Sequence, residues 1–222
     1  MRFRSSNPVF KYGDFSNESS YSATYSGVAS KTGFLLAIIA LVAMYIGAEW
    51  ELMFTSFTQL IVILIAAPII AIISVIVAHK NPAIAWIFSI IYALCEGAFL
   101  GIITAIYANI YGGDVVRIAL TATFGVFASM LVLYSTGIIR VGTFFRRFMM
   151  SMLFGLIGAS LLMLILVLFS GGFTGGLYTM YVGIVVVSCI ISALYLLIDF
   201  DNISNLVSAG AGKEYEWSLS LG

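Results

Sequence analysis

Six long apolar runs constrain this chain more than any other feature. They cover residues 33–48, 57–78, 82–111, 115–139, 148–170 and 177–198. A helix needs about 20 mostly apolar residues to cross the hydrocarbon core of a bilayer. Strands of a membrane barrel would instead alternate apolar and polar residues over about ten positions. The continuous runs therefore predict spanning helices.

The composition excludes a water-soluble domain. Hydrophobic residues make up 62% of the chain and charged residues 9%, against about 45–50% and 25% in typical soluble domains. The formal net charge is zero, so no basic field points to nucleic acid as a partner. We predict an all-α, polytopic transmembrane helical bundle with six complete spans and the start of a seventh near Trp217.

Basic residues alternate along the chain in a way that predicts its orientation. Lys31, Lys80, Arg146 and Lys213 lie on one set of loops and ends, whereas the opposite loops carry mainly acids. By the positive-inside rule, the N-terminus faces the cytoplasm. Residues 1–32 are predicted to be a flexible cytoplasmic tail. Residues 33–222 are predicted to be the transmembrane domain, in which the seventh helix is cut short.

The sequence offers little for catalysis or for holding a metal. It contains one histidine, His79, and two cysteines, Cys95 and Cys189, which lie within apolar runs. A zinc site needs several such ligands together, and no phosphate-binding glycine loop with its lysine is present. We expect no enzymatic activity, no catalytic or metal-binding residues, and no cofactor.

Glu96 is the most informative polar residue. It lies near the centre of the third run, where a charge costs on the order of 2.5–3.5 kcal/mol on insertion scales. Two interpretations stay open: an ion-pathway or pH-sensing carboxylate, and a neutral glutamate hydrogen-bonded to a neighbouring helix. Gly97 and Gly101 follow it as a small-xxx-small pair, where another backbone can approach closely.

Asp199 is the second candidate for an ion-pathway or pH-sensing group. It ends the sixth run and is expected at or just inside the cytoplasmic boundary. Asp201 and Arg140 are further candidates for such a site, and Asp201 is expected to be more exposed to solvent. A solvated acid at a helix end is the alternative interpretation of Asp199. Arg140 belongs to a basic cluster that sets topology, with a role in an ion pair or in binding anionic lipid as the alternative.

Four local patterns support a family resemblance. They are RSSNPVF (residues 4–10), EGAFLG (96–101), YSTGIIR continuing to Phe145 and Arg146 (134–146), and YLLIDFDNI (195–203). With this order and spacing, the chain resembles the Bax inhibitor-1 family, also called the transmembrane Bax inhibitor motif family. More narrowly, it resembles the bacterial Bax inhibitor-1-like branch, which implies the cytoplasmic (inner) membrane of a prokaryote.

The resemblance implies seven helices with the last one central, and a pH-sensitive calcium leak in some members. It also implies that an aspartate near the cytoplasmic end of the sixth helix pairs with an acid in the seventh. Asp199 matches that aspartate by its context. The paired acid is absent from the sequence, Glu214 and Glu216 precede the expected span, and Glu96 belongs to the branch rather than to the wider family.

Two functions therefore stay open for this chain. The first is a pH-sensitive cation leak with Ca²⁺ as the permeant ion, since Ca²⁺ prefers oxygen ligands and protonation removes a carboxylate's charge. The second is a non-conducting protein that modulates a membrane protease or a stress response through a membrane-protein partner. In both, the lipid bilayer surrounds the chain.

Overall fold

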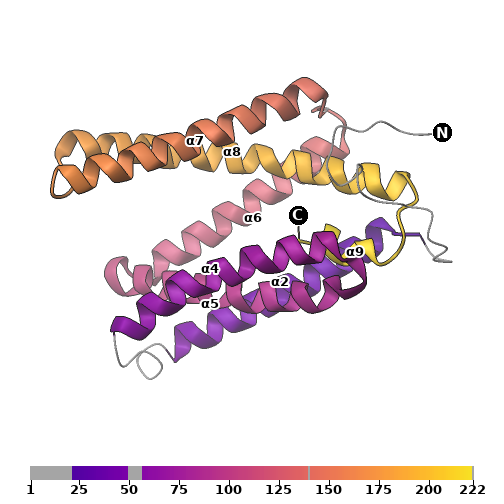
Figure 1. Ribbon diagram of the computed structural model, residues 1–222, viewed down its shortest axis with the longest axis horizontal. Coiled ribbons are helices and arrows are strands. Elements are labelled where there is room, and N and C mark those ends of the chain that lie inside the picture. Colours follow the sequence, from indigo (N-terminus) through magenta and orange to yellow (C-terminus); the bar gives the residue numbers. More distant parts are fainter. Residues whose placement is uncertain (1–21, 50–56, 140, 222) are drawn as a thin grey trace. The chain divides into compact units, whose positions relative to one another are not determined.

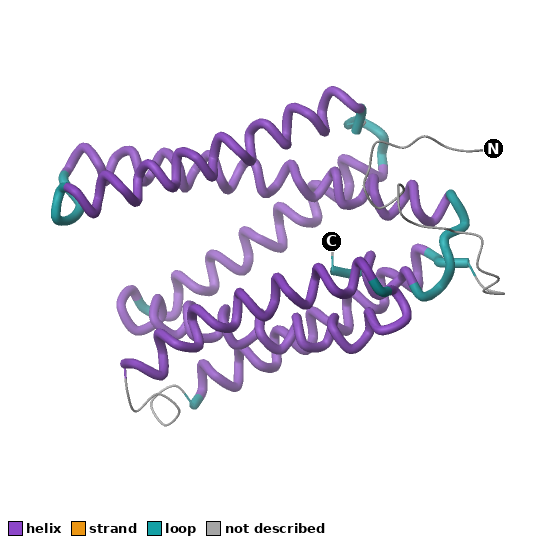
Figure 2. The backbone as a smooth tube through the Cα atoms, viewed as in Figure 1, coloured by secondary structure: helices purple, strands orange, loops and turns teal. Residues whose placement is uncertain are grey.

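The computed structural model describes residues 22–49, 57–139 and 141–221. These residues form helices joined by short loops, and no β-strand occurs among them (Figure 1, Figure 2). The elements are α2 (Tyr25–Ala48), α4 (Phe57–Lys80), the 3₁₀ turn η1 (Pro82–Ile84), α5 (Ala85–Tyr111), α6 (Gly113–Ser135), α7 (Thr143–Phe169), α8 (Gly175–Ser208) and α9 (Tyr215–Leu219).

Six of the described helices have the length and hydropathy needed to cross a membrane. Helix formation satisfies every backbone polar group internally, which the hydrocarbon core requires. Large apolar side chains are exposed along these helices, for example Met44 at 71%, Phe144 at 81% and Phe169 at 89%. Lipid solvates such a surface, so the all-α polytopic membrane fold predicted from the sequence is confirmed.

The largest differences from the predicted helix boundaries are at the start of α2 and at the end of α8. Helix α2 begins at Tyr25 rather than Gly33, because Thr24 caps it and its first turns pack against the C-terminal segment. Helix α8 continues past Ile198 to Ser208, so Asp199 lies within a helix and not at its end. A short helix, α9, forms around Trp217, where the start of a seventh was predicted.

The chain divides into two compact units. Unit 1 comprises residues 1–119 and 203–222, and unit 2 comprises residues 120–202. In unit 1, helices α2 and α4 both pack against α5, and α9 packs against all three. Helix α5 presents a buried stripe at helical spacing to these neighbours, formed by Ala85, Ser89, Ala93, Gly97, Gly101, Ile102 and Ala105.

A second apolar cluster of unit 1 ties its N- and C-terminal segments together. Val28 from α2 packs with Leu206, Ala211 and Leu219. Next to this cluster, Ser22 forms an isolated antiparallel bridge with Gly212. Residues from both ends of the described chain therefore build one small core.

Unit 2 consists of most of α6, all of α7 and α8 up to Asn202. Its core is a cluster of Met149 from α7 with Ile191 and Ile198 from α8. The hydroxyl of Tyr195 donates a hydrogen bond to the backbone oxygen of Met149 at 3.2 Å. This polar contact fixes α8 against α7 one helical turn before Asp199.

Candidate functional site

Glu96 lies deep within α5 of unit 1. It is eleven residues beyond Ala85, about 16 Å along the helix axis. The side chain is half-buried, and among the described residues its carboxyl group takes part in no recorded hydrogen bond or ion pair. The structure therefore retains a carboxyl group at depth without a polar partner in the described part of the chain.

The two glycines after Glu96, Gly97 and Gly101, lie in close contact with α2. A Cβ atom on Gly97 would lie 2.8 Å from Cβ of Val42 and 2.9 Å from the backbone oxygen of Ile39. A Cβ atom on Gly101 would lie 3.0 Å from Cα of Ala43. The predicted close approach at this small-xxx-small pair is confirmed, and it places Glu96 next to a tightly packed helix crossing.

Asp199 lies in unit 2, and Glu96 in unit 1. Leu197 and Ile198, which precede Asp199, are buried, and Asp199 itself is half-buried. No ion pair of Asp199 occurs among the described residues. Like Glu96, this carboxyl group lies inside a helix that could span a membrane.

Asp201 has more partners than the sequence indicates. Its side chain is 19% exposed and forms an ion pair with Arg146 of α7. The phenol of Tyr134 from α6 donates to Oδ1 of Asp201 at 3.4 Å, and Arg146 also donates to Oδ1 of Asn202 at 2.7 Å. The expectation that Asp201 extends into solvent was wrong, because a guanidinium from the next helix compensates its charge.

The arginine that pairs with this acidic segment is Arg146. An ion pair was instead predicted as one role of Arg140, which lies outside the described residues. Arg146 stands in the first turn of α7, four residues after the helix cap at Gly142. Its planar fork suits two oxygen acceptors at once, and here it binds one oxygen each of Asp201 and Asn202.

Aromatic packing holds the same segment of α8 against α6. The ring of Phe200 lies edge-on to Phe127, with centroids 5.7 Å apart. It also contacts Tyr134 at 5.9 Å. Asp199 and Asp201 thus flank an anchored aromatic residue, so their backbone positions are fixed within unit 2.

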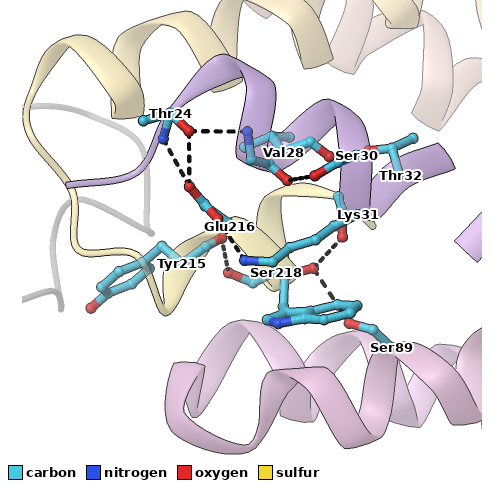
Figure 3. Close-up of polar contacts among 12 residues, drawn as sticks. Thr24, Val28, Ser30, Lys31, Thr32, Ser89, Tyr215, Glu216 and Ser218 are labelled. Carbon is cyan, nitrogen blue, oxygen red and sulfur yellow. Dashed lines mark hydrogen bonds and ion pairs between the residues drawn. The ribbon is translucent and has the colours of Figure 1, made fainter. Parts of the chain in front are cut away.

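A polar cluster around Glu216 was not predicted. Glu216 of α9 is buried, with its side chain 2% exposed, and Lys31 of α2 approaches Oε2 at 2.6 Å. Oε1 accepts the Thr24 backbone N–H at 2.9 Å and the Thr24 hydroxyl at 3.3 Å (Figure 3). From the sequence, Lys31 was predicted only to set the topology and Glu216 to precede a span, so their contact was missed.

Neighbouring residues of α9 extend this cluster. The Lys31 ammonium lies 5.2 Å from the centroid of the Trp217 ring, within the range of a cation–π contact. The hydroxyl of Ser89, buried in α5, donates to the backbone oxygen of Trp217 at 3.3 Å. Three segments far apart in sequence therefore meet at α9.

The environment of Glu216 alters its acidity. Burial by itself raises the pKa of Glu216, but hydrogen bonds from Lys31 and Thr24 and the charge of Lys31 outweigh burial and lower the pKa below its ordinary value. Burial and the nearby Glu214 raise the pKa of Tyr215. Glu216 is thus held as a carboxylate by its partners.

The comparison with known proteins assigns the family. A family model described as Bax inhibitor 1 like matches residues 7–222, nearly the whole chain. No curated protein and no solved structure matches the chain. The matched residues include all six long apolar helices, Glu96 and Asp199. The chain therefore belongs to the Bax inhibitor 1 like family.

Proposed function

We propose that this membrane protein is a pH-sensitive cation leak channel, with Ca²⁺ as the permeant ion, and has no enzymatic activity. One observation carries the proposal. Two carboxyl groups, Glu96 and Asp199, lie half-buried inside spanning helices and are in no ion pair among the described residues. Ionisable groups at such depth are costly and commonly mark ion pathways or proton relays.

The chemistry of the two groups suits a cation that passes without being held. Ca²⁺ takes six to eight oxygen ligands in a tight site, and one carboxylate supplies at most two of them. Water and backbone oxygens would complete a weak, transient shell. Conduction requires binding that is weak enough for the ion to leave, so sparse carboxylates favour a leak over a storage site.

The charge distribution supports a cytoplasmic N-terminus, and the resemblance to the bacterial branch of the family supports a prokaryotic inner membrane. Lys31 lies near the start of α2, Lys80 ends α4, and Arg146 and Arg147 begin α7. With six spans, these positions all fall on one side of the membrane. The positive-inside rule makes that side the cytoplasm.

Calcium flux from reconstituted liposomes tests the function directly. We expect the full chain to conduct, and Glu96→Gln, which keeps shape and hydrogen bonding, to lower the flux about tenfold or more, equivalent to ~1.4 kcal/mol of lost cation stabilisation. The matched control is Asp114→Asn, because Asp114 is 86% exposed at the start of α6. It should conduct like the parent protein.

Two outcomes would contradict the proposal. Equal flux through Glu96→Gln and Asp114→Asn would remove Glu96 from the pathway. A folded parent protein without any flux would favour the second function open from the sequence, a non-conducting protein that modulates a membrane protease or a stress response through a membrane partner.

A further inference from the structure

The first turn of α2 lacks part of its own cap. Thr24 is the N-cap residue, and its hydroxyl oxygen accepts the Gly27 backbone N–H at 3.0 Å. In a complete capping box, a Glu or Gln three residues after the cap reaches back to the backbone N–H of the cap residue. Here that position is Gly27, which has no side chain to do so.

Glu216 supplies the missing group from the other end of the described chain. Its Oε1 accepts the Thr24 backbone N–H at 2.9 Å, which is the bond that a glutamate at position 27 would make. A Cβ atom on Gly27 would collide with the Glu216 carboxylate. The carboxylate therefore occupies the space that a side chain at position 27 would take.

Lys31 completes the arrangement one helical turn after Gly27. Its ammonium binds Oε2 of Glu216 at 2.6 Å and lies over the ring of Trp217. Consecutive residues of α9 thus hold a single lysine of α2. The same carboxylate binds both Thr24 and Lys31, so neither contact can be kept when α9 leaves.

We infer that α9 acts as a latch, because Glu216 of α9 supplies the capping contact that α2 itself lacks. The undocking of α9 and the fraying of the first turn of α2 are then one event. The latch consists of Glu216 and Trp217 of α9 with Thr24, Gly27 and Lys31 of α2. When it opens, the Thr24 N–H and the Lys31 ammonium lose their shared acceptor, and Ser89 of α5 loses the Trp217 backbone oxygen. This conformational device does not depend on ion conduction.

The glycine at position 27 provides a specific test. Gly27→Glu combined with Glu216→Ala moves the carboxylate from α9 into α2. There it can form an ordinary capping box with Thr24 and an i,i+4 pair with Lys31 in the favourable order. This double variant restores the cap of α2 but not the contact between Glu216 of α9 and α2.

Two readouts are measured on the full chain in lipid nanodiscs. Hydrogen exchange of the amides of residues 24–28 reports on the start of α2. Thiol labelling of Ser218→Cys, in a background without Cys95 and Cys189, reports on α9, because Ser218 is 5% exposed. Glu216→Gln serves as a milder second variant that keeps the side-chain shape. Glu214→Gln is the matched control on the same segment.

We expect Glu216→Ala to raise exchange and labelling together, each about tenfold or more, and Glu216→Gln to raise both less. The double variant should return exchange to near the parent level while the introduced thiol stays reactive. The control should change neither readout. The inference is overturned if Glu216→Ala changes only one readout or neither, or if the double variant restores both.

Discussion

In each unit, an ion pair joins separate helices of the described chain, and the two pairs differ in how far they are exposed to solvent. In unit 1, Lys31 and Glu216 are 17% and 2% exposed and are separated by 185 residues in sequence. In unit 2, Arg146 and Asp201 are 29% and 19% exposed and are 55 residues apart. The Lys31–Glu216 pair holds α9 against α2. The Arg146–Asp201 pair is more exposed, and Asp201 lies two residues from Asp199.

Carboxyl groups therefore occupy two kinds of environment in this fold. A buried carboxylate with three donors, such as Glu216, is fixed in the ionised state and contributes to structure. A half-buried carboxyl group such as Asp199, which forms no ion pair among the described residues, is the kind of group for which we propose a role in proton exchange and cation passage. Four experiments test this difference between the two units.

The largest effect is expected from Lys31→Met. It leaves the Glu216 charge buried without its cation, which should cost about 3 kcal/mol, at the lower end for buried pairs because Lys31 is partly exposed. Equilibrium unfolding in detergent measures the loss. Arg117→Met breaks the exposed Asp114–Arg117 pair and should cost no more than about 0.5 kcal/mol. Similar losses in both variants would contradict a closed latch.

The second change is Gly97→Ala, which tests the α2–α5 crossing beside Glu96. The added Cβ atom would press on Val42 and Ile39, and such overpacking should cost about 2 kcal/mol. Gly155→Ala in α7 is the control, because nothing lies within 4 Å of its Cβ position. It should be neutral or stabilising by up to about 1 kcal/mol. A well-tolerated Gly97→Ala would mean that this crossing is looser than described.

The third change is Arg146→Lys, which keeps the charge but loses the fork that reaches Asp201 and Asn202. We expect a loss of about 1.5 kcal/mol, typical of a hydrogen bond to a charged group. Arg147→Lys, on the exposed neighbour, should change the free energy of unfolding by less than about 0.5 kcal/mol. A loss equal to that of Lys31→Met would erase the difference between the two pairs.

The smallest change is the pH dependence of unit 1. Because the pKa of Glu216 is lowered in the folded protein, the pair's contribution is fully present above the ordinary glutamate pKa. It is lost as the pH falls through the folded pKa. The free energy of unfolding should therefore decline on acidification in the parent protein. Glu216→Gln should be less sensitive over that range, and an equal decline in both would refute this assignment.

The sequence was sufficient to predict the helices and one of their contacts. Continuous apolar runs specify spanning helices because lipid allows few alternatives. The Gly97–Gly101 spacing predicted a close approach because only a surface without side chains admits another backbone. The sequence did not predict that α8 continues to Ser208, because the sixth apolar run ends at Ile198. The helix persists there since Arg146 compensates Asp201 and Leu206 packs against Val28.

Charge pairing could not be predicted in the same way. The pattern of basic residues indicates a side of the membrane, but it does not say which lysine meets which acid. Lys31 and Glu216 meet only because α9 folds back onto α2. The sequence also could not show that Arg146 forms an ion pair with Asp201, because the nearby Arg140 carries the same charge. Thr24 followed by Gly27 was the available clue: a good cap residue without its usual glutamate.

The most direct test of the proposed function is the pH profile of calcium flux for the parent protein and for Asp199→Asn, reconstituted side by side. Protonation removes the charge that attracts a cation, so flux through the parent should fall as the pH is lowered. Asp199→Asn should conduct with a flatter profile, and Asp114→Asn should keep the parent's profile. An unchanged profile in a correctly folded Asp199→Asn would contradict the role of this carboxyl group as the proton-sensitive element of the leak.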